Sequence, residues 1–493
     1  MLFRSSNLID SILIRAADRA HVAVPMMKMR GGRVEQIEGG YVHSLQPGLY
    51  EWVISLDFRA MYPSLIIENN ICFTTVHPEG TVVSPTGARF LKADVKKGLL
   101  PAILTNLMGD RQEVRQKMRE ATDPQLKEFY DGLQAAIKVL MNAFYGVLAS
   151  SFYRFNDPTV GASITAFARS TVQGIIGELE KESVKVVYAD TDSVFFQSPS
   201  HGVDEALQFA RRTAERFSRG RIAMEVDKVY ETLFSHGRKK RYAGKVAWPP
   251  EMHDEMVVRG YEIRRTDAFD LQSEAQRRIL ERILNRDQEG AISLAKEIVG
   301  SVARGHPLLE DPSRDFIEAL VISRTVKSTV TKELLSDGRF LQANDEAANK
   351  RPRTRELSPE DEERERRKKG GYLSPQSLSN IRAAKKLVDM GEEFTSGMKV
   401  SWIVTDSAKS PMDVEPYISG QEFIKAPDWA YYARRVAQTL AYVTEVFGWD
   451  EKALLTGKRS PAQRSLSSAD FNAEPGEDGP RKTEKNLKIE DFF

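Results

Sequence analysis

The sequence predicts an α+β protein with more than one domain. Short apolar runs rich in β-branched residues, such as "EWVISL" at residues 51–56, predict strands, and a long amphipathic pattern such as "QLKEFYDGLQAAIKVLMNAFYGVL", from Gln125, predicts a helix. The chain has 493 residues, 41% of them hydrophobic. At about 150 residues per domain, this length corresponds to roughly three domains.

Composition narrows the class of protein. Lys and Arg total 71 against 70 Asp and Glu, so a surface for a polyanion requires local clustering of basic residues. The one cysteine, Cys72, excludes an internal disulfide and a cysteine-based zinc site. The N-terminal apolar run is interrupted by Asp10 and Arg15, which is too short and too charged for a signal peptide or a membrane span. We therefore expect a cytoplasmic protein with no membrane partner.

Asp57 follows the predicted strand "EWVISL" directly. The segment "YPS", residues 62–64, ends the strand, because proline restricts the residue before it and lacks a ladder donor. A single Asp at this place is commonly the cap of the next helix. Its alternative role, as a metal ligand, depends on a second acidic cluster.

That second cluster lies in "VKVVYADTDSVFFQS". Two apolar runs, residues 184–188 and 193–196, flank a tight turn, which predicts a β-hairpin with Asp190 and Asp192 at its tip. Carboxylates this close repel each other unless a cation compensates, and Mg²⁺ prefers such hard oxygen ligands. With Asp57 supplied by a neighbouring strand, the carboxylates could hold two Mg²⁺ ions about 4 Å apart, as in in-line phosphoryl displacement.

Two helical patterns joined by "TDP" lie between the acidic clusters and predict a helical hairpin, with Pro124 at a helix start. Arg111 and Arg115 share one face at a spacing of four residues. On the second helix, Lys138, Asn142 and Tyr145 also share a face. Facing a metal site, these groups would suit a triphosphate. Taken alone, they would instead be interpreted as a solvated basic face.

Three of these segments together resemble a known family. "SLDFRAMYPSLI", "KVLMNAFYG" and "YADTDS" are similar, in this order, to the three main motifs of family B DNA polymerases. "KKRYAG" at residues 239–244 and "RGYEIRRTD" at residues 259–267 resemble that family's later primer-duplex motifs. The resemblance runs from near the N-terminus to about Trp449, with the charged segment 344–371 as a departure.

The resemblance implies a right-hand fold with a mixed or antiparallel β palm, helical-hairpin fingers and a mostly helical thumb. It implies these ranges: residues 1–48 as a remnant leading from an exonuclease domain, 49–93 and 151–235 as palm, 94–150 as fingers, 236–456 as thumb with a disordered insertion at 344–371, and 457–493 as a flexible tail.

The resemblance also implies residue roles. The catalytic residues would be Asp57, Asp190, Asp192 and Lys138. The metal ligands among them would be Asp57 and Asp192, together with the backbone of Phe58, with Asp190 nearby. Arg111, Arg115, Lys138 and Asn142 would bind the triphosphate of a deoxynucleotide, Tyr62 would exclude the ribose 2′-hydroxyl, and Tyr145 would line the new base pair. Lys239, Lys240, Arg241, Tyr242 and Arg265 would contact primer–template DNA.

Several departures from the family pattern set expectations about partners. The segment after Met1 resembles the end of the family's exonuclease domain, and Ile37 stands where the linker motif before two glycines usually has Tyr. We expect the N-terminal and exonuclease domains in a separate subunit; an exonuclease-free minimal polymerase or a fragment of a longer gene are the alternatives. The missing cysteine-rich C-terminal module favours an archaeal or viral-type enzyme, associated with the nucleoid.

The peptide "KNLKIEDFF" resembles the segment by which replication proteins bind the sliding clamp. Ile489, Phe492 and Phe493 would form its hydrophobic anchor, with Asn486 where Gln is usual. A sticky terminus without function is the alternative.

The sequence thus predicts template-directed DNA synthesis by two-metal phosphoryl transfer, in a replicative or repair polymerase. A non-catalytic, polymerase-like scaffold that binds DNA is the alternative, although a scaffold gains nothing from the carboxylates or from Lys138.

Overall fold

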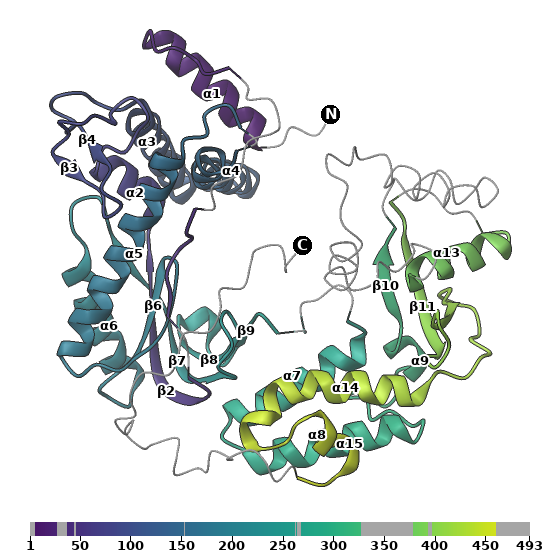
Figure 1. Cartoon of the computed structure of the whole chain (residues 1–493). Helices are drawn as coiled ribbons and strands as arrows, with labels where there is room; N and C mark the ends of the chain where they lie inside the picture. The colour runs from purple at the N-terminus through teal and green to yellow at the C-terminus, as the bar shows by residue number, and fades with distance from the viewer. Residues whose placement is uncertain are drawn as a thin grey trace, which may run out of the picture.

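The structure is a computed structural model, shown in Figure 1, that describes residues 5–26, 37–43, 46–151, 153–261, 263, 268–326, 378–392 and 397–459. Three sequence-based expectations fall on residues outside these ranges: the insertion 344–371, the DNA contact of Arg265 and the peptide 486–493.

A seven-stranded antiparallel sheet forms the centre of the fold, in the order β1-β5-β6-β2-β7-β8-β9. Its strands are β1 (Val42–His43), β2 (Gly48–Phe58), β5 (Val186–Asp190), β6 (Ser193–Gln197), β7 (Met224–Ser235), β8 (Tyr242–Trp248) and β9 (Met256–Arg259). Strand β2 pairs with β6 on one side and with β7 on the other. The segment that carries Asp57 is therefore held in the middle of the sheet.

Hydrophobic side chains pack on both faces of this sheet. Ile54 and Leu56 of β2 pack with residues of helices α5 (Pro158–Lys181) and α6 (Val203–Phe217) in one core cluster. Figure 1 shows these two helices beside the strands of the sheet. Val53, one residue away and pointing to the opposite face, packs with Tyr188 and Tyr230 in a second cluster. Because side chains alternate between the two faces along β2, Asp57 points to the same face as Val53, away from α5 and α6.

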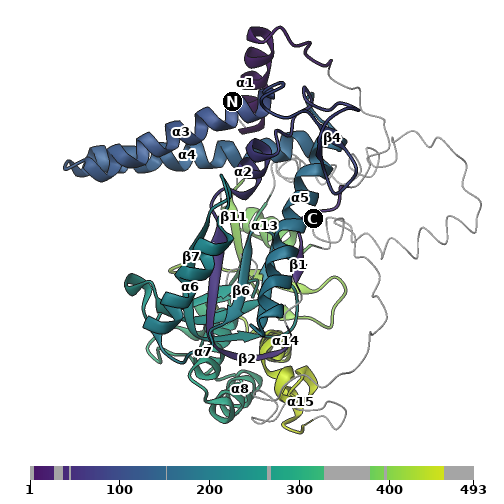
Figure 2. The ribbon, with the colours of Figure 1, turned by 90° about the vertical axis from the view of Figure 1, so that its left-hand side faces the viewer.

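Two long helices, α3 (Leu99–Glu120) and α4 (Pro124–Ala149), form the expected helical hairpin and project side by side from the sheet (Figure 2). The Asp123 side chain accepts a hydrogen bond from the Gln125 N–H at the start of α4, and Pro124 occupies the first turn. The base of the hairpin packs against α1 (Ser5–Arg19), α2 (Met61–Glu68) and the small ribbon of β3 (Val82–Val83) and β4 (Arg89–Phe90).

By length and composition alone, α4 could also cross a membrane, and it is the one such helix in the described part of the chain.

The remaining described residues form a second, mainly helical body. The 3₁₀ turn Pro250–Met252 belongs to the large sheet, where it lies between β8 and β9. The helical body consists of α7 (Asp270–Leu284), α8 (Gln288–Ala303), α9 (Phe316–Ala319), α13 (Ser379–Asp389), α14 (Trp429–Thr444), α15 (Glu451–Thr456), a three-stranded sheet of β10 (Ile322–Thr325), β11 (Lys399–Asp406) and β12 (Asp413–Pro416), and the 3₁₀ turn Glu445–Phe447. Its core is continuous with Phe234, Ala243 and Val258 at the edge of the large sheet.

The α+β class and both hairpins are confirmed. One detail differs from the expected ranges: strands β8 and β9 continue the large sheet past residue 235, where we place the end of the palm from the sequence. The reason is that β8 pairs with β7 from Ser235 opposite Tyr242 onward, so the chain folds back onto the same sheet before it leaves.

Candidate active site

Asp57 and Asp192 meet at the ends of two neighbouring strands. Asp57 is the penultimate residue of β2 and lies opposite Ser193 of β6. The Phe58 N–H donates a hydrogen bond of 2.9 Å to the Asp192 carbonyl oxygen. The helix-cap role of Asp57 is not what the structure shows, because α2 begins after Ala60, which has a φ of 52° and no side-chain capping bond.

The β5–β6 turn consists of Thr191 and Asp192. Thr191 adopts a φ of 57°, which is unfavourable for a β-branched residue, and its N–H donates to the Tyr41 carbonyl oxygen over 2.8 Å. The segment before β1 therefore holds the turn in place. Gly40 lies so close that a Cβ there would come within 2.8 Å of the Thr191 hydroxyl oxygen.

The fold holds the carboxylates of Asp57 and Asp192 close together although their negative charges repel each other. Burial raises the pKa of Asp57 to about 7, with repulsion from Asp192 and Asp227 adding to the effect and Lys138 opposing it. Burial also raises the pKa of Asp192. A divalent cation would remove both penalties, and carboxylate oxygens are the ligands that Mg²⁺ prefers.

Asp57 and Asp192 fit a Mg²⁺ site in which a substrate supplies further oxygen ligands. Among the described residues, no group of three or more His, Cys, Asp or Glu side chains could hold a metal by itself. Asp57 and Asp192 fit the pattern in which one or two carboxylates bind Mg²⁺ and substrate phosphates and water complete the shell.

Asp190 is occupied by other partners. Its carboxylate accepts hydrogen bonds from the Tyr188 hydroxyl at 3.2 Å and the Thr191 hydroxyl at 3.0 Å, and it lies 3.2 Å from the Lys240 ammonium. This carboxylate therefore acts mainly within the protein.

A cavity of about 450 Å³ opens beside the two carboxylates. It lies between the sheet and the helical hairpin. Its lining residues are Asp57, Phe58, Arg59, Ala60, Met61, Tyr62, Arg111, Arg115, Lys138, Asn142, Thr191, Asp192 and Glu225. The fold thus brings the acidic and basic clusters of the sequence to one cavity.

The helical hairpin forms the cationic wall of this cavity. Arg111 donates a hydrogen bond of 3.2 Å to the Gln134 side chain, while its Nε is buried without a hydrogen-bond partner. Burial, together with the nearby charges of Arg115 and Arg59, lowers the pKa of Arg111. Grouped cations with an unsatisfied donor are a binding site for a polyanion.

Tyr62 forms the side of the cavity at the start of α2. Its ring lies 4.8 Å from that of Tyr145, at an angle of 47°. Burial raises the pKa of Tyr62 to about 12, so its hydroxyl stays protonated. The pair is therefore a neutral, aromatic wall next to the charged groups.

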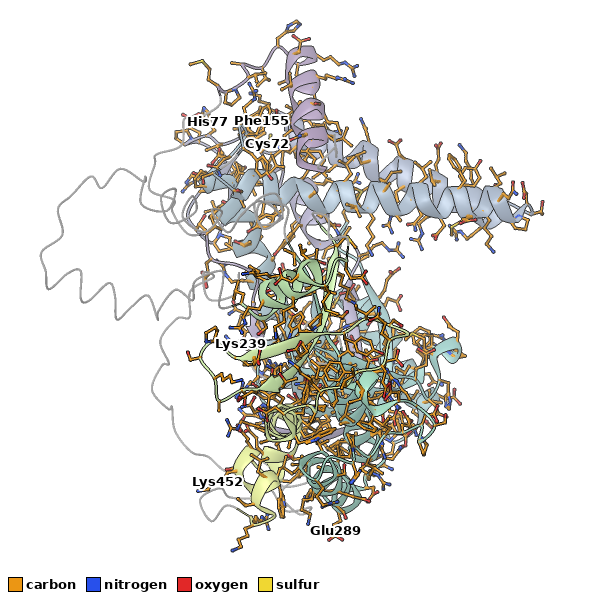
Figure 3. All side chains as sticks on the ribbon, turned by 90° about the vertical axis from the view of Figure 1, so that its right-hand side faces the viewer. Cys72, His77, Phe155, Lys239, Glu289 and Lys452 are labelled. Atoms are coloured by element: carbon orange, nitrogen blue, oxygen red, sulfur yellow. The ribbon has the colours of Figure 1, made fainter. Side chains whose placement is uncertain are left out.

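The predicted DNA-contacting residues divide into two groups. Lys239, at the surface in Figure 3, and Lys240 are exposed on the turn between β7 and β8, whereas Arg241 and Tyr242 are partly buried. The Tyr242 ring packs against Tyr188 of β5 and Phe195 of β6. Its contacts in this structure are internal.

Sequence reasoning missed Arg59, Glu225 and Asp227. Arg59 and Glu225 form an ion pair at the cavity, and Glu225 lies opposite Asp57 in the sheet. The available signal was the alternation of acidic residues in "MEVDK", which places both carboxylates on one strand face.

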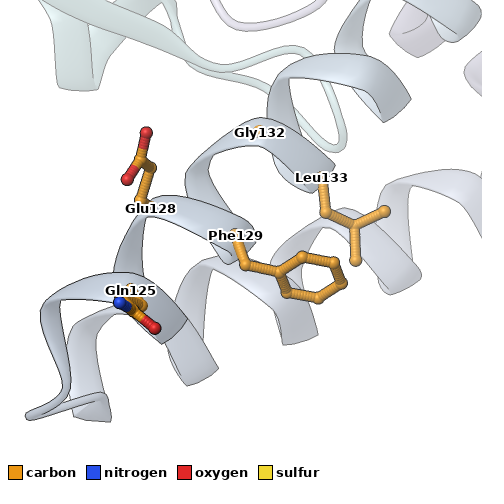
Figure 4. A pocket seen from close by; sticks show the side chains of 5 residues that line it. All are labelled: Gln125, Glu128, Phe129, Gly132 and Leu133. Atoms are coloured by element: carbon orange, nitrogen blue, oxygen red, sulfur yellow. The ribbon is translucent and has the colours of Figure 1, made fainter.

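A second hollow, of about 460 Å³, lies near the tip of the helical hairpin and is lined by Gln125, Glu128, Phe129, Gly132 and Leu133 (Figure 4). Gln125 precedes Lys138 by 13 residues, or about 20 Å along a helix. Because this hollow is shallow and largely apolar, the cavity at the carboxylates remains the candidate active site.

An antiparallel palm sheet, a helical hairpin and a separate helical body, with strand-end carboxylates facing a cationic wall, define the class of right-hand polymerase folds. The sequence model of DNA polymerase family B matches residues 2–334, more than half of the chain. The chain belongs to DNA polymerase family B. Polymerases of this family use divalent metal ions.

Individual relatives agree with this assignment. The chain is similar to the DNA polymerase delta catalytic subunit of Mesocricetus auratus (33% identity over 318 residues, covering 59% of this chain and 29% of the relative). It is also similar to a DNA polymerase of Thermococcus gorgonarius (32% over 312 residues, 61% and 39%). The solved family B polymerase of Pyrobaculum calidifontis superposes with a TM-score of 0.59 at 26% identity, covering 90% of this chain and 51% of that one. The chain thus spans less than half the length of these curated relatives.

Proposed function

We propose that this chain extends a primer along a DNA template, using deoxynucleoside triphosphates. One observation carries the proposal: a single cavity is lined by two half-buried carboxylates, Asp57 at the end of β2 and Asp192 in the β5–β6 turn, and by the cations Arg111, Arg115 and Lys138. This is the charge pattern that a metal-bound triphosphate requires.

The residues of the cavity would have separate roles in metal binding and in triphosphate binding. Asp57 and Asp192 would hold two Mg²⁺ ions, which when bound supply positive charge to the reacting phosphate. Arg111, Arg115, Lys138 and Asn142 would hold the triphosphate in line with the primer 3′-hydroxyl. Attack on the α-phosphate forms the new phosphodiester bond and releases pyrophosphate, whose charge Lys138 and the arginines would stabilise.

Substrate choice would follow from the aromatic wall. The Tyr62 ring, which packs against Tyr145, lines the same cavity as the carboxylates that would hold the metal ions and the cations that would hold the triphosphate. In this position it would contact the sugar, where the 2′-hydroxyl distinguishes a ribonucleotide. Lys239, Lys240, Arg241 and Arg265 would hold the primer–template backbone without reading its sequence.

The proposed partner is a sliding clamp, bound through Asn486, Ile489, Phe492 and Phe493. This proposal rests on the resemblance of the short segment 485–493. The proposed setting is the nucleoid of an archaeal or viral-type system.

The decisive experiment is primer extension by the purified chain on a single-stranded template, with four deoxynucleotides and Mg²⁺. We expect template-dependent products from the wild type and none from the double variant Asp57→Asn, Asp192→Asn, while both bind the duplex. Binding by both proteins without extension by either would instead support the scaffold alternative.

A further inference from the structure

The turn between β7 and β8, residues 236–241, contacts both the β5–β6 hairpin and the helical body. It begins after Ser235, ends before Tyr242 and carries His236, Arg238 and Lys240. The turn contacts Asp190 on one side and Tyr442 and Glu445 on the other. These contacts connect the helical body to the carboxylates of the candidate active site.

On the side of the active site, the turn reaches Asp190 by two routes. The Lys240 ammonium lies 3.2 Å from the Asp190 carboxylate. The Lys240 backbone also hydrogen-bonds to Tyr188, whose hydroxyl donates to Asp190. Asp190 precedes the two-residue turn that ends in Asp192, so a shift of Lys240 is passed to the carboxylate at the cavity.

The conformation of Lys240 is tightly determined. Its φ is 64°, which is rare for a residue with a side chain. Gly260, on the neighbouring turn, lies so close that a Cβ there would come within 2.1 Å of the Lys240 carbonyl oxygen. A strained residue of this kind keeps its geometry only if its surroundings hold it.

On the side of the helical body, the holding groups come from the C-terminal end of α14. The guanidinium groups of Arg238 and Arg241 lie over the Tyr442 ring, 5.0 and 4.7 Å from its centroid. Glu445 forms a hydrogen bond of 2.5 Å with His236, whose side chain is only 5% exposed. Cation–π contacts and a largely buried charge-assisted bond are both strong enough to fix a turn.

We propose that Tyr442 and Glu445 are positioning residues for catalysis: they hold the turn 236–241, which through Lys240 and Asp190 sets the position of Asp192. The inference rests on the proposed polymerase function. It links the placement of the helical body on the sheet to the rate of the chemical step, in addition to any effect on DNA affinity.

The test is single-turnover nucleotide incorporation on a preformed primer–template complex. Tyr442→Leu should lower the maximal incorporation rate by about 10- to 100-fold, the scale of a small misplacement of catalytic groups, with a much smaller change in duplex affinity. Tyr442→Phe keeps the ring and should restore the rate. Arg434→Ala, an exposed change on the same helix, serves as the matched control.

A double-mutant cycle identifies the route. If Tyr442 acts through Lys240, Tyr442→Leu should add little to the loss caused by Lys240→Ala. Glu445→Gln provides a second, nearly isosteric variant should the leucine variant fold poorly. Additive losses, equal losses with Phe and Leu, or a loss confined to DNA affinity would each overturn the inference. An inactive wild type would instead refute the proposed function.

Discussion

The Phe58 N–H and the Asp192 carbonyl oxygen form a 2.9 Å hydrogen bond that joins the end of β2, which carries Asp57, to the β5–β6 turn, which carries Asp192. The bond lies beyond the last ladder pair, Asp57 opposite Ser193. It fixes the two strand ends to each other without using either carboxylate. Both side chains thus remain available to the cavity, although their charges repel.

The three carboxylates should differ in their effect on activity. Asp57→Asn or Asp192→Asn should each lower incorporation by at least about 100-fold, because each removes a charged oxygen from the cavity. Asp190→Asn should cost less and leave the Mg²⁺ dependence of the rate unchanged, because the Asp190 carboxylate bonds to Tyr188, Thr191 and Lys240. Mg²⁺ titrations of all three variants check this, and a shifted Mg²⁺ requirement for Asp190→Asn would count against it.

Stability without metal should depend on pH through Asp57. Its folded pKa of about 7 lies above the ordinary value of 3.8, so the folded state binds the proton more tightly and the charged form is penalised. This contribution favours folding at low pH and is lost as the pH rises through 7. In EDTA, Asp57→Asn should therefore raise the melting temperature at pH 8, and the gain should shrink toward pH 4. A variant less stable than wild type at pH 8 would contradict this sign.

Tyr62 should control sugar discrimination. Tyr62→Ala should raise the relative use of ribonucleotides by at least about tenfold, because the ring next to the carboxylates is removed while no proposed metal ligand changes. Tyr62→Phe, which keeps the ring, is the control. Competition between ATP and dATP at one template position measures the effect; unchanged discrimination in the alanine variant would exclude this role.

Arg111 should bind phosphate through its planar fork. Arg111→Lys should raise the KM for deoxynucleotides by about tenfold, since a lysine ammonium cannot reproduce two parallel hydrogen bonds. Arg119→Lys, an exposed change on the same helix, should have no effect. Steady-state kinetics on a fixed primer–template measures both, and equal KM values for the two variants would argue against a phosphate contact of Arg111.

The segment 486–493 should make synthesis responsive to a clamp. On a primed circular template, a clamp with its loader should increase processivity of the full chain but not of a chain that ends at Lys485. The replacement of Phe492 and Phe493 by Ala offers a control of unchanged length. Equal stimulation of all forms would place the clamp contact elsewhere.

The sequence predicted the elements best where local chemistry decides them. The strand before Asp57 and the two helices around Pro124 follow from periodicity and capping, and the structure confirms them. Helices α5 and α6 cover one face of the sheet. This arrangement depends on long-range packing, which no local pattern in the sequence indicated.

The same limit explains what was missed at the candidate site. Glu225 lies opposite Asp57 and pairs with Arg59 only because β7 pairs with β2 in one particular register, and register is a tertiary property. The internal role of the Tyr242 ring likewise depends on a neighbouring strand pair. The residue types in the sequence predicted a site of carboxylates and cations. Which of these residues lie next to each other depends on how the strands pair.

The helical hairpin of α3 and α4 is anchored at one end. The buried residues of α3 are Leu100, Pro101 and Leu104, and those of α4 are Met141, Phe144, Val147 and Leu148, all near the base. Arg111, Arg115 and Lys138 lie further out, where the two helices mainly pack against each other. Among the described residues, the hairpin thus packs against the rest of the molecule mainly at its base. Under the proposed function, a rotation about that base would move Arg111, Arg115 and Lys138 relative to Asp57 and Asp192, so that binding of the triphosphate and its alignment with the carboxylates would change together.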